Sequence, residues 1–439
     1  MNAERRNGAR EPIRLSDHFS YGRLIRFTMP TIIMMIFTSI YSVVDGLFVS
    51  NAVGKTEFAA LNFIFPFIMV LGGAGFMIGT GGTAQVAQQL GRGNKEKANR
   101  YFSMMVCFTV LLGILLAAIG IAVIRPVCVL LGATPEMMEG CVLYGRIVIA
   151  FTPAFMLQNV FQSFLAAAEK PKLGLFVTVA AGLTNAALDA LFIVGFRWGL
   201  AGAALATGIG QALSTGVYLV VYASTELPVR LRRACLKLDK ELDTRLYSIG
   251  IPAILNLALP SLLVTFLNSL LAAFSGSYVV VLGIYYKLQT FLYLPANGIV
   301  QGMRPLIGYN YGAGEHKRVR QLYQITLILS AAIMAAGTLG CLAASEPLMR
   351  LFTSTPETVD AGKVALRIIC LGFVVSAIST TSSGALEGLG KGTQSLVISL
   401  CRYIVFIMPL AWVLCRQFGP VGVWNAFWAT EVLSAIVSL

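Results

Sequence analysis

Two carboxylates lie deep inside apolar stretches of the chain. Asp45 lies about six residues from the end of its stretch, and Asp189 lies about seven residues from the end of another. A charged side chain at the centre of a membrane helix costs about 2.5–3.5 kcal/mol on insertion scales, so such residues usually serve a function. Two neighbouring carboxylates in a partly dry site repel each other, and we expect the pair to take up a proton or share a cation.

Polar side chains extend from both carboxylates along the same helix faces. Tyr41 precedes Asp45 by four residues and Asn185 precedes Asp189 by four, so each pair shares a face. Thr207 and Tyr144 lie on two further helices at the same depth to within about one helical turn, or about 5 Å, and the four helices concerned can therefore meet in one layer. Further polar or aromatic residues on these faces are Thr38, Tyr144, Phe151, Phe155, Gln158, Gln162, Thr178, Gln211 and Ser214.

Such stripes would be penalised against lipid, so we expect them to line the interior of a helix bundle or a wet cavity. Hydrogen bonding between helices is the alternative role, and we favour it for Thr178 and Ser214. For Asp45 and Asp189 we favour a functional role, because a carboxylate is a costly means of joining helices.

The composition places these residues in a lipid bilayer. Hydrophobic residues make up 57% of the 439 residues and charged residues only 12%, with a mean hydropathy of +0.77, which is too apolar for a soluble domain of this size. A helix needs about 20 apolar residues to span the membrane, and twelve stretches qualify. The predicted all-α, polytopic fold has helices at 26–50, 58–89, 101–124, 140–167, 171–196, 199–223, 246–273, 278–308, 321–344, 362–388, 393–415 and 419–439.

The chain repeats itself at an offset of 221 residues. Gly91 pairs with Gly312 and Pro126 with Pro347, among other matches in one register. Because each copy has six helices, both enter the membrane from the same side, and the copies should form two six-helix lobes related by a pseudo-two-fold axis along the membrane normal. We predict an N-terminal segment at 1–25, an N-lobe at 26–223, a linker at 224–245 and a C-lobe at 246–439.

Basic residues gather in alternate loops. Of 33 Lys and Arg residues, 22 lie in the N-terminal segment and in the loops on one side, which predicts a cytoplasmic N terminus and linker. The formal charge of +13 therefore reflects topology, with some attraction to lipid head groups. Nucleic-acid binding is disfavoured, because the basic residues are scattered over loops without a recognition motif. The last stretch ends at Leu439 without a basic flank, so we expect the native chain to continue.

The two copies differ in their polar residues. Leu267 and Leu410 occupy the positions that match Asp45 and Asp189, so the acid pair exists once. The eighth helix instead carries Tyr286, Gln289, Tyr293 and Asn297 on one face, which suits contact with a flat ligand. For Lys287 two roles stay open: a gate or ion-pair partner, and a buried structural charge. Glu431 could line the second lobe, whereas Glu387 and the arginines Arg146, Arg304, Arg367 and Arg402 are expected to extend toward the membrane surface.

The sequence motifs give little support for an enzyme. The spans contain no HExxH, no GxSxG and no paired metal ligands, and the eight cysteines lack ligand spacing. We therefore expect neither an enzyme nor a cofactor, and no bound metal other than Na⁺ at the acid pair.

Several segments together resemble the multidrug and toxic compound extrusion (MATE) family, in particular its bacterial multidrug-exporter branch. They are PTIIMMIFTSIYSVVDGLFVS in the first helix, QQLGRGN after the second, NAALD in the fifth, and LQTFLYLPANGIVQGMRPLIGYNYGAGEHKRVR in the eighth. The resemblance covers nearly the whole chain. It implies a V-shaped pair of lobes around a central cavity, in the bacterial inner membrane, that exports organic cations in exchange for inward H⁺ or Na⁺.

The resemblance also implies residue roles. The family's N-lobe cation site maps to Asp45, Asn185, Asp189 and Thr207, and its kink in the first helix maps to Pro30. The substrate cavity would be formed by Tyr41, Tyr144, Phe151, Phe155, Gln158, Gln162, Gln211, Gln289, Tyr293 and Asn297. Some members place essential acids on the seventh and tenth helices, where this chain has Leu267 and Ser379-Thr380, so this part of the pattern is missing here.

Three alternatives remain at this stage. A lipid-linked oligosaccharide flippase of the same superfamily would share the helix count but would need a basic cavity for its anionic head group. A membrane-embedded enzyme would need the motifs that are missing above. A channel would transport independently of a counter-ion gradient. We favour a monomeric exporter of small organic cations, with membrane lipids around it.

Overall fold

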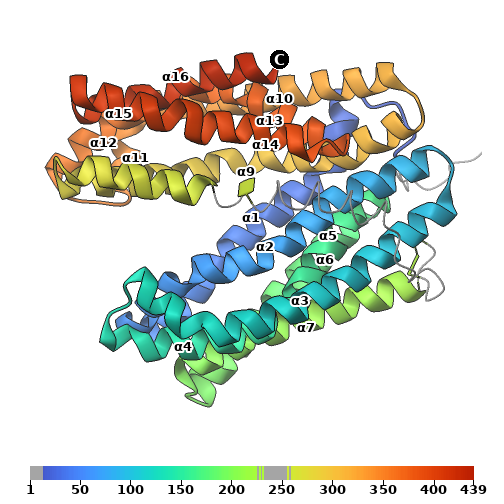
Figure 1. Cartoon of the computed structure of the whole chain (residues 1–439), viewed down its shortest axis with the longest axis horizontal. Coiled ribbons are helices and arrows are strands. Elements are labelled where there is room, and N and C mark those ends of the chain that lie inside the picture. Colours follow the sequence, from blue (N-terminus) through green and yellow to red (C-terminus); the bar gives the residue numbers. More distant parts are fainter. Residues whose placement is uncertain (1–12, 225–226, 229, 232–254, 257–258) are drawn as a thin grey trace, which may run out of the picture.

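The computed structural model describes residues 13–439 except 225–226, 229, 232–254 and 257–258. Every regular element in this part of the chain is a helix. The helices form two lobes, which meet at one end of the molecule and diverge toward the other (Figure 1). The predicted linker, 224–245, falls almost wholly outside the described residues.

The N-lobe contains the helices of the first copy. One span is bent by 53° where α4 gives way to α5. The break falls at Phe151, just before Pro153, whose ring and missing N–H prevent a continuous helix. The elements are α1 (Tyr21–Ala52), α2 (Lys55–Gly91), α3 (Lys95–Leu131), α4 (Pro135–Ala150), α5 (Thr152–Ala167), α6 (Pro171–Asp189), the π-helix η1 (Ala190–Gly195) and α7 (Gly199–Ser224).

The C-lobe repeats this order. Its first helix is described from Leu259 to Ala272, and a short 3-10 turn, η3, interrupts the span that matches α4 and α5. Gly372, at the end of η3, is the position equivalent to Phe151 in the repeat. The other elements are α9 (Gly276–Gly312), α10 (His316–Ala343), α11 (Ser345–Arg350), α12 (Pro356–Ile369), η3 (Cys370–Gly372), α13 (Phe373–Gly388), α14 (Gly392–Leu400), the π-helix η4 (Cys401–Phe406), α15 (Ile407–Phe418) and α16 (Pro420–Ser438).

The observed spans agree with the twelve predicted ones. Ten helices of the described chain are long and apolar enough to cross a membrane, and the bent pair α4 and α5 forms an eleventh. The apolar helix Leu259–Ala272 lies within the predicted stretch 246–273 and completes the set. Several helices are longer than predicted. α2, α3 and α9 each have 37 residues, because their polar ends continue as helix beyond the apolar core.

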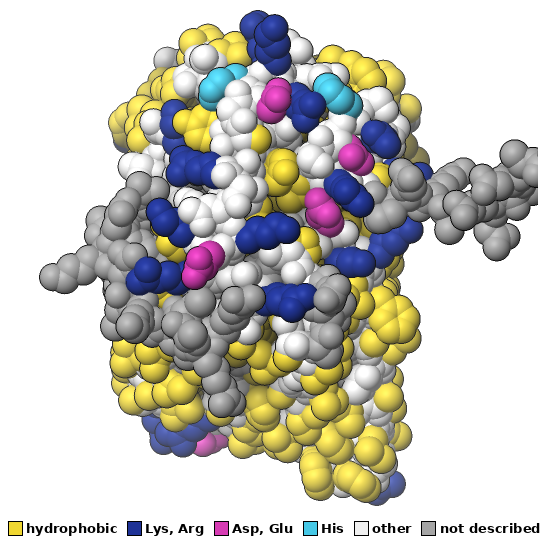
Figure 2. Space-filling view, turned by 90° about the vertical axis from the view of Figure 1, so that its right-hand side faces the viewer, with side chains coloured by type: hydrophobic (Ala, Val, Ile, Leu, Met, Phe, Trp, Pro, Cys, Tyr) yellow, Lys and Arg dark blue, Asp and Glu magenta, His cyan; other side chains and the backbone are white. Residues whose placement is uncertain are grey.

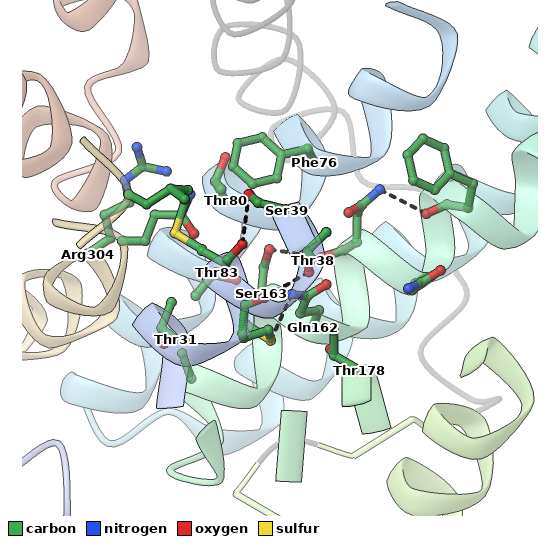
Figure 3. Close-up of a pocket in the computed structure, with 18 of the residues that line it drawn as sticks. Thr31, Thr38, Ser39, Phe76, Thr80, Thr83, Gln162, Ser163, Thr178 and Arg304 are labelled. Atoms are coloured by element: carbon green, nitrogen blue, oxygen red, sulfur yellow. Dashed lines mark hydrogen bonds between the residues drawn. The ribbon is translucent and has the colours of Figure 1, made fainter. Parts of the chain in front are cut away.

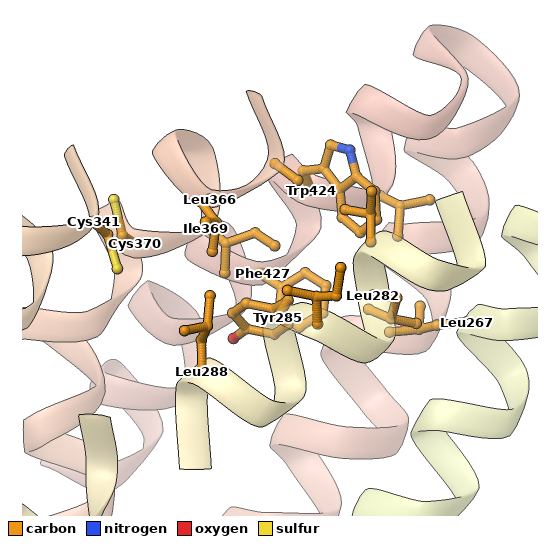
Figure 4. Packing of buried hydrophobic residues seen from close by; sticks show 14 of the residues in the cluster. Leu267, Leu282, Tyr285, Leu288, Cys341, Leu366, Ile369, Cys370, Trp424 and Phe427 are labelled. Carbon is orange, nitrogen blue, oxygen red and sulfur yellow. The ribbon is translucent and has the colours of Figure 1, made fainter. Parts of the chain in front are cut away.

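Each lobe has its own tightly packed interior. In the C-lobe, Leu267, Tyr285, Trp424 and Phe427 belong to one buried cluster (Figure 4), and the rings of Tyr285 and Phe427 meet edge to face at 5.2 Å. Leu267, which stands where the N-lobe has Asp45, is fully buried in this cluster. The space that serves polar chemistry in one lobe is therefore filled by apolar packing in the other.

Small residues hold the lobes together at one end. Gly91 at the end of α2 lies against the backbone of Tyr309, and Gly312 at the end of α9 lies against the backbone of Gln88. These two glycines are equivalent in the repeat, and so are Gly93 and Gly314, which have φ values of 76° and 77°. A side chain at Gly91 or Gly312 would collide with the partner backbone, so only glycine permits so close an approach.

The segment before α1 bridges the same end. The Leu15 amide donates to Glu169 Oε1 of the N-lobe at 2.7 Å, and its carbonyl accepts from Asn310 Nδ2 of the C-lobe at 3.3 Å. The Arg318 guanidinium donates to the Ser16 carbonyl at 3.0 Å. The Leu15 side chain is 1% exposed, so the bridge is packed as well as hydrogen-bonded.

Basic side chains gather at this end. Figure 2 looks onto it and shows Lys and Arg residues over the face that carries the loops after α2 and α9. Below this face the visible surface is mainly hydrophobic (Figure 2), as expected of a surface in contact with lipid. We call it the basic end.

We expect Gly312→Ala to weaken the contact between the lobes. The added methyl group would meet the Gln88 backbone, and overpacking of this kind costs about 1–3 kcal/mol. Thermal unfolding of the purified protein should shift to lower temperature, and spin labels on α2 and α9 near the basic end should move apart. Gly216→Ala is the control, because a methyl group there meets no atom within 4 Å. Equal melting temperatures of the two variants would contradict this account of the contact.

Candidate functional site: an acid pair beside a cavity between the lobes

The structure brings the two deep carboxylates together. Asp45 on α1 and Asp189 at the end of α6 adjoin each other and interact electrostatically. Asp189 is fully buried, and neither of its carboxylate oxygens has a hydrogen-bonding partner, nor has Asp45 Oδ1. Among the described residues, no Lys or Arg forms an ion pair with either one. Such a pair is incomplete without a proton or a cation.

Polar groups from four helices surround the pair. The phenols of Tyr41 and Tyr144 both lie near enough to interact with the two carboxylates, and Tyr144 also lies beside the Thr207 hydroxyl of α7. Asn185, one turn before Asp189, is 2% exposed, and both atoms of its amide lack a partner. The arrangement thus offers carboxylate, amide and hydroxyl oxygens to a small cation.

The backbone changes its hydrogen-bonding pattern immediately after Asp189. Residues Ala190–Gly195 form the π-helix η1, in which the Phe196 amide donates to the Leu191 carbonyl, five residues earlier, at 2.8 Å. A π-turn of this kind is rare and is found mostly at functional positions. It ends the regular helix at the residue whose side chain has to meet Asp45.

A small cavity of 60 Å³ reaches toward the acid pair. Asn185 and Thr207 line it, together with Tyr41, Gln158 and Gln211. The last three of these residues also line a cavity of 360 Å³ between the lobes. The acid pair therefore lies behind a polar wall, rather than directly on the large cavity.

The large cavity is lined mostly by the N-lobe, with α9 closing its other side. Figure 3 shows Arg304 of α9 across the cavity from Thr178, with Thr38, Ser39 and Gln162 between them. Gln162 Nε2 lies 2.9 Å from the Met34 sulfur. Phe155 contributes an aromatic wall, held where Gly72 leaves space for its ring.

Two further cavities continue the same space into the C-lobe. One of 260 Å³ shares Met35, Phe76 and Arg304 with the large cavity. Another of 450 Å³ shares Asn297 and Arg402 with the second. It is lined by the remaining predicted C-lobe residues, Gln289 and Tyr293. A run of adjoining cavities thus leads from the polar wall in front of the acid pair to the C-lobe interior.

Two predicted cavity residues lie elsewhere. Tyr144 is 3% exposed and lines none of these cavities; it belongs to the surroundings of the acid pair. Phe151 lines none of them either, because it sits at the break between α4 and α5, with its ring against Gly208 of α7. Pro30 is buried within α1, which continues as a helix on both sides of it.

Two ion pairs in the C-lobe correct the sequence-based expectation. Arg304 Nη2 lies 2.6 Å from Glu387 Oε2, and Arg402 donates to Glu431. We expected Glu387 and both arginines to extend toward the membrane surface, and that prediction was wrong, because each has an oppositely charged partner on another helix. The only available signal was the presence of these two acids and two arginines in the spans of the second copy, and of the two ion pairs only Arg402 and Glu431 lie in consecutive spans. Lys287, in contrast, is exposed and has no ion-pair partner among the described residues.

Comparison with known proteins identifies the architecture. The MatE family profile matches residues 30–191 and 252–413, two stretches of equal length that begin at the paired residues Pro30 and Pro252. Among curated relatives, the multidrug export protein MepA of Staphylococcus haemolyticus is 25% identical over 419 residues, covering 95% of this chain and 92% of MepA. MepA of Staphylococcus aureus strain MSSA476 is 22% identical over 417 residues, with the same coverage.

Solved structures share the fold. An outward-facing multidrug resistance MATE transporter of the MOP superfamily superposes with a TM-score of 0.91 at 22% identity, covering 97% of this chain and 95% of the other. A MOP superfamily transporter from Pyrococcus furiosus, described as having a binding pocket of reverse polarity, gives 0.90 at 21% identity with the same coverage. The two lobes and their relative placement are therefore those of known transporters.

We expect the acid pair to make the folded protein sensitive to protons and small cations. A ligand that binds only the folded state stabilises it, so the melting temperature of the purified protein should rise at mildly acidic pH, or when Na⁺ replaces K⁺ at equal ionic strength. Asp189→Asn removes the repulsion and should be more stable at alkaline pH, by about 1–3 kcal/mol. It should also lose the response to cations.

Glu139→Gln is the matched control for this experiment. Glu139 is an exposed acid that pairs with Arg125 at 2.9 Å, far from the cavities. This variant should keep the full response to pH and Na⁺. An Asp189→Asn protein that responds as strongly as the control would show that the pair does not bind these cations.

Proposed function

Because the chain belongs to the MATE family of membrane transporters, we propose that it exports small organic cations in exchange for inward-moving H⁺ or Na⁺. The observation that carries this proposal is the acid pair, Asp45 and Asp189, which has no basic partner among the described residues and lies behind the polar wall of a small N-lobe cavity next to the cavity between the lobes. A site that lacks its counter-charge can hold a coupling ion and a cationic substrate only in turn.

The charge pattern supports an outward-open state. Positively charged loops favour the cytoplasmic side of a bacterial inner membrane, so the basic end and the N terminus would be cytoplasmic. The lobes meet at that end through Gly91 and Gly312, and the cavity would then open outward. One chain holds both lobes and the whole cavity, which is consistent with a monomer.

Neutralisation of the pair would drive the exchange. When a proton or Na⁺ binds, the attraction between Asp45 and a cationic substrate falls, and the substrate is released. α1 is the element best placed to respond, because it carries Asp45 and Tyr41 and also contains Pro30, which removes one backbone hydrogen bond. One charge that moves inward down a potential of about 150 mV supplies roughly 3.5 kcal/mol, enough for a gradient of a few hundredfold.

The cavity suits flat, apolar cations of varied shape. Phe155, Tyr41 and Tyr293 supply aromatic faces, which attract organic cations. Met34 and Met35 line the same space and adapt to different outlines.

A flippase for an anionic lipid head group is the second candidate. Arg304 and Arg402 on the cavity wall favour it. Both arginines are already paired with glutamates, so the cavity does not have the large excess of positive charge that such a head group requires. We therefore prefer the cation exporter.

We expect everted membrane vesicles that contain the protein to accumulate a cationic dye when a pH or Na⁺ gradient is imposed. Asp45→Asn and Asp189→Asn should each abolish gradient-dependent uptake, because either change removes half of the coupling site. Glu139→Gln should transport as the unaltered protein does. Full transport by both Asp variants would refute the proposed site, and gradient-independent uptake would indicate a channel.

A further inference from the structure

The cavity of 260 Å³ between the lobes has a charge pattern opposite to that of the acid pair. Its described lining contains Arg304 from α9 and Arg402 from η4, and no Asp or Glu. Hydroxyl and amide groups complete a wall that is rich in hydrogen-bond donors: Asn297, Gln301, Ser379, Thr380, Ser383, Ser399 and Tyr403. A wall of this kind suits an acceptor such as a carboxylate.

Two N–H groups of Arg304, beside this wall, have no hydrogen-bond acceptor. Its Nη2 is bound by Glu387 at 2.6 Å, while Nε and Nη1 are buried and have no acceptor. Glu387 is held in turn by the Ser395 hydroxyl at 3.0 Å. A buried N–H group without an acceptor is costly, so a turn of the guanidinium that brings these donors to the cavity surface would be favoured when a ligand supplies an acceptor.

Arg402 is fixed in a similar way on the opposite side. It donates through Nη2 to Glu431 and lies over the Tyr403 ring, 5.6 Å from its centroid. It lines both the 260 Å³ and the 450 Å³ cavities. Glu431, which also lines the 450 Å³ cavity, is 8% exposed and its Oε2 has no donor, so the glutamate can accept one further hydrogen bond.

We propose that the C-lobe half of the cavity is a subsite for the carboxylate of a planar zwitterionic substrate, with Arg304 and Arg402 as its donors. The aromatic residues Tyr286 and Tyr293 of the adjoining cavity would hold the flat body of the molecule. Its cationic end would point past Met35 and Phe76 toward the N-lobe. This inference rests on the proposed function for its biological meaning, but the binding it predicts does not depend on transport.

The paired glutamates set the selectivity of the subsite. Because Glu387 and Glu431 neutralise the two arginines, the subsite does not attract every anion. It binds preferentially a carboxylate that accepts directed hydrogen bonds from the arginines. A cation without a carboxylate leaves those donors unpaired and gains nothing from them.

The test compares two dyes that differ by one functional group. A rhodamine with a free carboxylate is zwitterionic, and its methyl ester is a plain cation of the same shape. Their dissociation constants are measured by fluorescence anisotropy on the purified protein in lipid nanodiscs. The double variant Arg402→Gln/Glu431→Gln removes the guanidinium without leaving a buried charge unpaired. It should weaken binding of the carboxylate dye about tenfold and change binding of the ester less than about twofold.

Two further variants make the result specific. The double variant Arg304→Gln/Glu387→Gln should also weaken binding of the carboxylate dye more than binding of the ester. Arg416→Gln should affect neither dye, because Arg416 lies on α15 against the Trp412 ring, 4.0 Å from its centroid, and outside these cavities. An unchanged ratio of the two dissociation constants in both double variants would overturn the subsite.

The outcome is separable from the transport experiment. If the protein does not transport the dye but the double variants still weaken binding of the carboxylate dye selectively, the proposed export is wrong and the subsite stands. If transport is normal but the double variants do not weaken that binding selectively, only the subsite is wrong. If the double variants weaken binding of both dyes equally, the ion pairs shape the cavity without contacting the carboxylate, and the inference is again overturned.

Discussion

A charge inside a bilayer has to be neutralised close by, and the two lobes meet this constraint differently. In the C-lobe, Glu387 and Glu431 each pair with an arginine of a neighbouring helix. In the N-lobe, Asp45 and Asp189 adjoin each other and have no basic partner in the described chain. The two arginines of the C-lobe cavities are therefore neutralised within the protein, whereas the acid pair of the N-lobe is not. An exchange of ions for substrates can be built on this difference.

The contact at the basic end links this chemistry to the arrangement of the lobes. Gly91 and Gly312 are equivalent in the repeat and each packs on the opposite lobe, so the duplication supplies both halves of a nearly symmetric contact. α1 takes part in it as well, since Thr28 packs against Gly302 of α9. The helix that carries Asp45 is thus also part of the contact that closes this end. The acid pair and the contact at the basic end are thus joined by one continuous helix, in which Pro30 lies between them.

The fold was largely predictable, whereas the site was predictable only in part. The family and structural comparisons confirm the membrane fold and the two lobes, the observed helices are consistent with twelve spans, and the meeting of Asp45 with Asp189 follows the depth and face expected of them. Phe151 lies outside the cavities because Pro153 breaks the span beside it, which hydropathy does not reveal. The positions of Arg304 and Arg402 were predicted wrongly, because depth along a helix does not tell which way a side chain points.

The sequence by itself determined the solvent, the number of helices, their duplication and the depth of the acid pair, since these depend on hydropathy and spacing along the chain. Only the tertiary structure decided that the acid pair lies behind a polar wall, that two arginines face the central cavity, and that both are held by glutamates. These features depend on the rotation and tilt of each helix, which packing against its neighbours sets and local sequence does not.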